Sequence, residues 1–303
     1  MPEPVHRSRC LDKQLQALLA VWPEDPERFH ALWRQLNNPE PLLHHAARHG
    51  VLGVLRGPLS EAAALPPALQ QAVDERLLAE RLWQEQLLQA HRESLAALEA
   101  AGIRAAVLKG PILSERLYGD PAIRRSTDVD LLIDPSELPR ALTALASAGY
   151  EREAGPSTLY YERYHHHIAL YRPLRPVLEL HLRLFTGFGV VLRAADVLPR
   201  CQRFHSATGL DCWLLDAEDE FLHLCIHAAG HEFERLAWLY DLKLHLRQHS
   251  VSNWPALFER AKTWGVGLAL AFTLEVLQER LAVTLPGVEP CLRRFRSRWQ
   301  PAT

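Results

Sequence analysis

Residues 124–133 read RRSTDVDLLI, a stretch in which two carboxylates open an apolar run. Successive side chains of a strand point to opposite faces, so Asp128 and Asp130 are predicted to point to the same face. Two like charges held this close repel each other unless a cation lies between them. Hard divalent cations that bind carboxylates and substrate phosphates, above all Mg²⁺, are the usual occupants of such a pair. The stretch therefore predicts a buried strand that carries a magnesium site.

A second motif, residues 108–110 with the sequence LKG, lies upstream of the carboxylates. The apolar run 103–108 predicts a buried strand, and Pro111 is well placed at the first position of a following helix. A helix start with a glycine turn can receive phosphates through backbone N–H groups and the helix dipole. Lys109 is one of only four lysines among 34 basic residues, and a compact ammonium suits a phosphate as a point charge.

The Asp-x-Asp pattern by itself is also common in surface turns. Here an apolar run follows it and the Lys-Gly-Pro turn precedes it, so we favour a catalytic site over a surface turn. A turn that receives phosphates and a carboxylate pair that holds Mg²⁺ make up most of a phosphoryl-transfer site. The sequence around Gly110 does not match a Walker loop, which disfavours a P-loop kinase.

A third carboxylate from a neighbouring strand would complete a two-metal site. Residues 177–184 read VLELHLRL, which predicts a strand with Glu179, His181 and Arg183 on one face and leucines on the other. Glu179 is the candidate ligand. The alternative is that this row is the solvent-facing side of an amphipathic edge strand.

The periodicity predicts an α+β fold with a small mixed sheet, flanked by helical regions at both ends. We expect a helical N-terminal region (1–101), a sheet-containing core (102–215) and a helical C-terminal region (216–303). Within the core we expect strands at 103–108 and 129–133, helices at 111–118 and 135–148, and a hairpin of strands 160–171 and 177–184.

Two histidine rows have structural and functional interpretations. His223, His227 and His231 lie four apart with no HExxH pattern, so a packed helix face is as well supported as a functional one, and zinc ranks third. Residues 165–167 are three consecutive histidines in a predicted strand. They could offer one or two imidazoles to the cleft, but we favour a surface position.

The composition is that of a globular protein, with 48% hydrophobic and 23% charged residues and a formal net charge of −2. The charge gives no global basic field for wrapping nucleic acid. No apolar run approaches the length needed to span a bilayer, and the N-terminus lacks a signal segment. The five cysteines are scattered without a CxxC pair, so we expect reduced thiols and a cytoplasmic protein.

These motifs resemble those of the nucleotidyltransferases of the DNA polymerase β superfamily. Within it the chain looks most like a bacterial group of uncharacterised nucleotidyltransferases, which share an LKG turn, an R-x-x-x-D-x-D strand and a later E-L-H. The matching pieces here are residues 108–110, 124–133 and 179–181. The resemblance extends downstream and adds three candidate nucleotide-binding or cleft residues, His227, His231 and Asp241.

The resemblance implies a polymerase β-like core and a reaction that moves a nucleoside monophosphate from a nucleoside triphosphate to an acceptor hydroxyl, with release of pyrophosphate. Asp128, Asp130 and Glu179 would be the catalytic ligands of two Mg²⁺ ions. The triphosphate would be bound by residues of the turn and the loop before the strand, with His181 orienting the acceptor or a carboxylate. These binding candidates are Lys109, Gly110, Arg124, Ser126 and Thr127.

The acceptor does not follow from the resemblance and could be a small molecule, a protein or tRNA. Two alternatives stay open: a catalytically degenerate protein that binds nucleotide and regulates a partner, and a toxin-like enzyme that transfers nucleotides to tRNA. The Lys-Gly turn and the Arg-Ser-Thr-Asp-x-Asp stretch also resemble nucleotidyltransferase toxins of abortive-infection systems. No obligate protein partner and no membrane partner are inferred.

Overall fold

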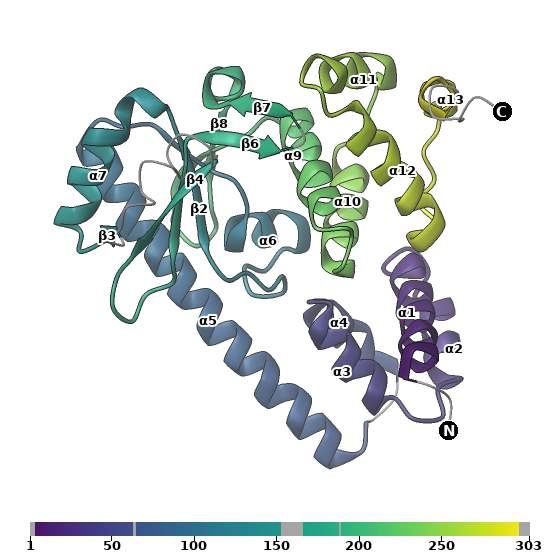
Figure 1. Ribbon diagram of the computed structural model, residues 1–303. Helices are drawn as coiled ribbons and strands as arrows, with labels where there is room; N and C mark the ends of the chain where they lie inside the picture. The colour runs from purple at the N-terminus through teal and green to yellow at the C-terminus, as the bar shows by residue number, and fades with distance from the viewer. Residues whose placement is uncertain (1–3, 63–64, 153–165, 188, 297–303) are drawn as a thin grey trace. The chain divides into compact units, whose positions relative to one another are not determined.

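The computed structural model of the chain describes residues 4–62, 65–152, 166–187 and 189–296 (Figure 1). The chain forms two compact units, one of Glu80–His223 and one of Met1–Ala79 together with Leu224–Thr303. The carboxylate and Lys-Gly motifs all fall in the Glu80–His223 unit. The three-part division expected from the sequence stays a prediction.

The Glu80–His223 unit is built on a seven-stranded sheet with the order β3-β4-β5-β2-β1-β9-β8. Its pairs β2–β5 and β1–β9 are parallel and the others antiparallel, so the predicted mixed sheet is confirmed. Two further strands, β6 (Arg183–Gly187) and β7 (Val190–Arg193), pair in a second small sheet. The strands of the large sheet are β1 (Ala105–Val107), β2 (Val129–Ile133), β3 (Glu151–Arg152), β4 (His167–Tyr171), β5 (Leu178–His181), β8 (Gln202–His205) and β9 (Asp211–Leu214).

One face of this sheet forms the hydrophobic core with α5 (Pro67–Ala100) and α7 (Leu138–Ser147) (Figure 1). The core contains Val129, Leu131 and Ile133 of β2, which alternate with Asp130 along the strand. The opposite face of β2 is therefore left for Asp130. The helices contribute Leu87, Leu88, Ala90, Leu98, Ala141 and Leu145.

The predicted strands at 103–108 and 129–133 correspond to β1 and β2, and the predicted helix at 111–118 corresponds to α6 (Gly110–Tyr118). The helix predicted at 135–148 is a short 3₁₀ turn (Pro135–Glu137) followed by α7. The predicted hairpin is the antiparallel pair β4–β5. Residues 160–165 of the first predicted strand lie outside the described residues.

One strand prediction is wrong at its end. The sequence predicted a strand through residue 184, but β5 ends at His181 and Arg183 starts β6 in the other sheet. The backbone N–H groups of Leu182 and Arg183 both donate to the carbonyl oxygen of His166, at 2.8 and 3.2 Å. This shared acceptor ends the regular ladder, so Arg183 does not continue the row of Glu179 and His181.

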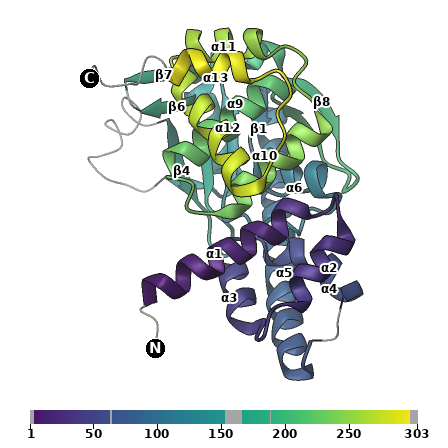
Figure 2. The ribbon, with the colours of Figure 1, turned by 90° about the vertical axis from the view of Figure 1, so that its right-hand side faces the viewer.

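The other unit is helical, as predicted for both ends of the chain. Within it α1 (Pro4–Val21) packs against α12 (Gly267–Leu281) (Figure 2). The ammonium of Lys243 donates to the carbonyl oxygens of Leu19, Ala20 and Trp22 at 2.7–2.9 Å. No helix in the described part of the chain combines the length and apolar character needed to cross a bilayer. The helices are α1 (Pro4–Val21), α2 (Pro26–Arg34), α3 (Glu40–Arg48), α4 (Leu52–Ala62), the first part of α5, the end of α9 (Ala217–Gly230), α10 (Leu236–Gln248), α11 (Trp254–Thr263), α12 (Gly267–Leu281) and α13 (Glu289–Arg296).

The five cysteines are all free thiols. Their different exposures to solvent predict different reactivities, which can be measured to test the fold. Cys10 is exposed, whereas the other four are buried, and burial raises the pKa of Cys201 to about 11 and of Cys212 to about 12. Because the thiolate is the reactive form, titration of the native protein with a chromogenic disulfide should show one fast thiol, which a Cys10→Ser variant removes. The remaining thiols should react only after denaturation. Several fast thiols in the Cys10→Ser variant would contradict the packing described here.

Candidate active site

The polar face of β2 and its neighbours gathers the predicted chemistry in one place. In the parallel β2–β5 ladder Asp130 lies opposite Glu179, and in the antiparallel β4–β5 ladder His167 lies opposite His181. Directly paired residues of neighbouring strands share a face of the sheet. The register therefore places two carboxylates and two imidazoles beside one another. Because β5 lies between β4 and β2, it is an inner strand, and the edge-strand alternative for Glu179 does not apply.

His181 connects the two carboxylates. Its Nε2 donates to Asp130 Oδ1 at 2.9 Å and lies 3.6 Å from Glu179 Oε2. The ammonium of Lys109 lies 3.3 Å from the other oxygen of Asp130. Asp130, Glu179 and His181 each place one potential ligand atom within 4.8 Å of those of the other two. Asp130 and His181 are almost fully buried, with 2% and 3% exposure, so these charges interact with little screening by water.

Asp128 lies just before β2 and is half-buried. It is not in the group of ligand atoms within 4.8 Å, but it belongs to the same electrostatic cluster. Burial, followed by the negative charges of Asp130 and Glu179, raises the pKa of Asp128, and Lys109 opposes the rise. A carboxylate that is costly to ionise beside two others is what a cation would stabilise.

The other two members of the cluster show the same competition. Burial alone would raise the pKa of Glu179, but hydrogen bonding to His181 and the neighbouring His167 lower it below its usual value. Burial alone would lower the pKa of His181, but hydrogen bonds to Asp130 and Glu179 raise it above its usual value. The two carboxylates thus favour protonation of His181.

The Lys-Gly turn is built at the end of β1. The Leu108 N–H donates to the Asp130 carbonyl oxygen at 3.2 Å, which brings the turn beside β2, and α6 begins at Gly110. Gly110 has a φ of +76°, and a Cβ atom there would lie 3.1 Å from Cε1 of the fully buried His91. The positive φ favours glycine, and the close approach of His91 leaves little room for a Cβ atom. No pattern in the sequence marked His91, whose Nδ1 donates to the Leu87 carbonyl oxygen at 2.8 Å.

The loop before β2 is held by buried hydrogen bonds. The Arg124 guanidinium donates to Ser126 Oγ at 2.8 Å, and the Ser126 carbonyl oxygen accepts from Trp83 Nε1 and Gln84 Nε2 at 3.0 and 3.1 Å. Thr127 is exposed, and its hydrogen bond to the Asp128 carboxylate opposes part of the rise in the pKa of Asp128. Trp83 and Gln84 of α5 were not predicted, because nothing in a helical repeat marks the two residues that fix a distant loop.

The histidines before and at the start of β4 are closer to the carboxylates than the sequence suggested. The surface position favoured for residues 165–167 is wrong for His166 and His167, which are half-buried and lie near His181, with ring centroids 5.4 and 5.2 Å from its ring. His165 lies outside the described residues. His167 Nδ1 is 3.5 Å from Glu179 Oε2. Burial and the neighbouring His181 lower the pKa of His166 to about 3.

Three predicted residues belong to the helical unit. His227 and His231 pack their rings against each other and against Trp238, with centroids 4.7–5.0 Å apart, and Asp241 is fully buried. Their predicted role at the nucleotide stays a prediction. Zinc binding by residues 223, 227 and 231 is not supported, since His231 follows the end of α9 and no group of potential metal ligands among the described residues contains them.

The carboxylate cluster fits a hard divalent cation. Asp128, Asp130 and Glu179 would supply oxygen ligands, which Mg²⁺ prefers, and burial followed by the charges of Asp130 and Glu179 raises the pKa of Asp128. Among the described residues, Lys109, His181 and His167 lie 2.9–3.6 Å from oxygens of Asp130 or Glu179 and can offset part of that charge.

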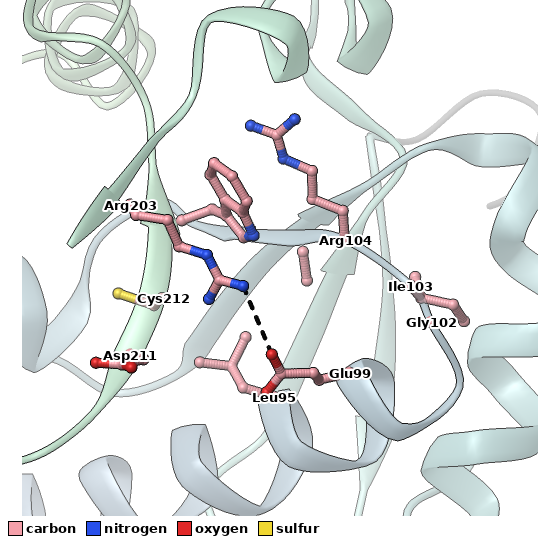
Figure 3. A pocket seen from close by; sticks show the side chains of 10 residues that line it. Leu95, Glu99, Gly102, Ile103, Arg104, Arg203, Asp211 and Cys212 are labelled. Atoms are coloured by element: carbon pink, nitrogen blue, oxygen red, sulfur yellow. Dashed lines mark ion pairs between the residues drawn. The ribbon is translucent and has the colours of Figure 1, made fainter. Parts of the chain in front are cut away.

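A cavity of about 200 Å³ lies elsewhere in this unit, beside the residues that precede β1 (Figure 3). Arg104 and Arg203 lie over the ring of Trp213, 3.7 and 4.6 Å from its centroid, and Arg203 pairs with Glu99 at 3.6 Å. The cavity is lined by residues that precede and begin β1, whereas Lys109 and Gly110 follow this strand. None of the predicted site residues lines this cavity.

Comparison with solved structures gives distant similarities. The antibiotic-resistance factor ANT(2'')-Ia is 12% identical, with 72% of this chain and 94% of that chain covered and a TM-score of 0.42. The lincosamide antibiotic adenylyltransferase LnuA is 14% identical, with 53% and 94% covered and a TM-score of 0.36. An antigenic nucleotidyltransferase-like protein from Paracoccidioides brasiliensis is 19% identical, with 69% and 93% covered and a TM-score of 0.40. No curated protein is significantly similar in sequence.

The family comparison is more extensive, because it covers most of the chain and both compact units. Residues 35–282 match the profile of a protein family described as uncharacterised nucleotidyltransferase. The matched segment includes the Lys-Gly turn, the Asp-x-Asp strand and Glu179. The chain therefore belongs to the uncharacterised nucleotidyltransferase family, and it is a nucleotidyltransferase with a mixed α+β fold.

Proposed function

We propose that the protein is a Mg²⁺-dependent enzyme that moves a nucleoside monophosphate from a nucleoside triphosphate to an acceptor hydroxyl and releases pyrophosphate. The observation that carries the proposal is the pairing of Asp130 with Glu179 across β2 and β5, with Asp128 in the same electrostatic cluster. Two carboxylates paired across a sheet, with a third just before one of the strands, suit the ligand set of two-metal phosphoryl transfer.

Asp128 and Asp130 are the proposed ligands of both ions, and Glu179 completes the second site. Bound Mg²⁺ would neutralise the triphosphate and lower the pKa of the acceptor hydroxyl. His181 is proposed as a positioning residue: its Nε2–H fixes one Asp130 oxygen and lies near Glu179, so both carboxylates keep their orientation and charge.

The turn at the start of α6 is the proposed phosphate site. The first N–H groups of α6, which begins at Gly110, have no partners within the helix and suit an anion. The ammonium of Lys109 lies beside Asp130. It can therefore contact a phosphate that Mg²⁺ would hold at the same carboxylates. Arg124 is proposed to balance the negative charge of the leaving pyrophosphate through its positive charge. It is buried and donates a hydrogen bond to Ser126.

The competing proposal is a degenerate relative that binds nucleotide without turning it over. Loss of a carboxylate would be its mark, and this chain retains all three. We therefore favour catalysis. Incubation with each α-labelled nucleoside triphosphate, Mg²⁺ and cell extract tests this directly: a labelled acceptor supports the enzyme. Nucleotide binding with no labelled product from any extract supports the degenerate alternative.

Asp130→Asn should abolish nucleotide transfer, because it keeps the side-chain shape and removes the anion. We expect a loss of about 100-fold or more in rate, as for removal of a single group that stabilises the transition state. The matched control is Asp134→Asn, the same change at the residue after β2, where the carboxylate caps Ser136. The measurement is the initial rate with α-labelled nucleotide, with circular dichroism to confirm folding. An Asp130→Asn variant as active as the control would exclude Asp130 as a metal ligand.

Lys109→Ala should weaken triphosphate binding about 10- to 100-fold, the range expected for one charge-assisted hydrogen bond. Binding of the corresponding nucleoside should change little, because the ammonium is proposed to meet phosphates. The difference between variant and wild type should shrink as salt is raised. Lys262→Ala, an exposed lysine on α11 paired with Glu259, is the control. Equal affinities of the Lys109 and Lys262 variants for a non-hydrolysable triphosphate would show that Lys109 is an ordinary turn residue.

A further inference from the structure

Three imidazoles meet at the β4–β5 side of the carboxylate cluster. His166, His167 and His181 each place one ring nitrogen within 4.8 Å of those of the other two. The ring centroids are 4.6–5.4 Å apart. The described part of the chain contains no other group of three potential ligands made of imidazoles alone. These three imidazoles offer nitrogen ligands, whereas the neighbouring carboxylates offer oxygen ligands.

The backbone holds this trio in place. His167 pairs with His181 in the ladder, and the carbonyl oxygen of His166 accepts two N–H groups from the residues that follow His181. The same contact ends β5, so the break in the strand and the convergence of the imidazoles have one origin. Nitrogen ligands around a tetrahedral zinc ion with bonds near 2.0–2.1 Å lie about 3.3 Å apart, so zinc would draw the three nitrogens together from within 4.8 Å.

His181 has the hydrogen-bonding pattern of a metal ligand. Its Nε2–H donates to the Asp130 carboxylate, whereas its Nδ1 is buried and has no partner among the described residues. Histidines that bind metals almost always donate their other ring N–H to a carboxylate or carbonyl oxygen. A metal bound at Nδ1 in place of a proton would satisfy this unpaired nitrogen of His181.

We propose that His166, His167 and His181 form a second, nitrogen-based metal site that binds Zn²⁺ beside the carboxylate site. Imidazole suits zinc and other late divalent ions, whereas Mg²⁺ takes oxygen ligands, so the two sites select different metals. Three protein ligands leave a fourth position open, as in zinc sites that bind water or substrate. The binding of zinc does not rest on the proposed nucleotide transfer, and it is measured without it.

A second group of potential ligands, in the helical unit, serves as the control. His45 and His49 contact Asp12 at 2.7 and 3.1 Å, but the Nδ1 of His49 accepts from the Leu236 N–H at 3.3 Å. His49 Nε2 then carries the ring proton and cannot bind a metal. We expect no zinc at this group.

The experiment is competition between the full-length protein, freed of metal, and a chromogenic zinc chelator in the presence of excess Mg²⁺. Wild type should take up one equivalent of Zn²⁺. The variant His166→Gln/His167→Gln should lose at least the roughly 10- to 100-fold that removal of an outer partner of a metal ligand costs. His49→Gln and the exposed His205→Gln should bind as wild type does. Both altered histidines of the double variant are half-buried at most, and its melting curve checks its fold.

X-ray absorption at the zinc edge of the wild-type complex gives a readout that does not depend on any variant, and it should show three imidazole ligands. An oxygen-only coordination shell, or loss of binding in His49→Gln with retention in the double variant, would overturn the proposal. Zinc binding without any nucleotide transfer would leave this site standing and remove the proposed function, so the two failures are distinguishable.

Discussion

The structure of the site depends on the register of β2 against β5, which sets the Asp130 carboxylate beside that of Glu179. Breaking a buried ion pair by removing one partner costs about 3–5 kcal/mol, so this register needs compensating cations. Lys109 and His181 provide them, at 3.3 and 2.9 Å from Asp130. The Lys-Gly turn, the end of β1 and the strand carrying His181 are thus all coupled to one buried carboxylate. A divalent ion bound at the same oxygens would take over part of this compensation.

Much of this arrangement was predictable from residues alone. The alternation of Asp130 with Val129 and Leu131 predicted both a buried strand and the face on which the carboxylate lies, and the structure confirms the strand. The alternation of residues 177–181 predicted Glu179 and His181 on one face, because a period of two is a local property of strands. The Lys-Gly-Pro turn predicted the start of α6 for a similarly local reason: proline suits the first turn of a helix and glycine a positive φ.

The rest depends on contacts between distant residues. The end of β5 at His181 is set by the carbonyl oxygen of His166, which no pattern in residues 177–184 reveals. The position of His166 and His167 beside His181 follows from the pairing of β4 with β5. The sequence does not show which strands pair, and a row of consecutive histidines was therefore interpreted as a surface feature. His91 became relevant only when the fold brought α5 beneath Gly110. The short strands β8 and β9 carry too few residues for a clear periodicity.

The most direct measurement is a crystal structure of the protein with Mn²⁺, as a detectable substitute for Mg²⁺, and a non-hydrolysable nucleoside triphosphate. An anomalous difference map locates manganese independently of any assumption about the ligands. We predict manganese at the oxygens of Asp128, Asp130 and Glu179, with the phosphates against Lys109 and the N-terminus of α6. Triphosphate bound elsewhere, or manganese absent from all three carboxylates while nucleotide is bound, would contradict the central claim that this cluster is a metal-dependent nucleotide-transfer site.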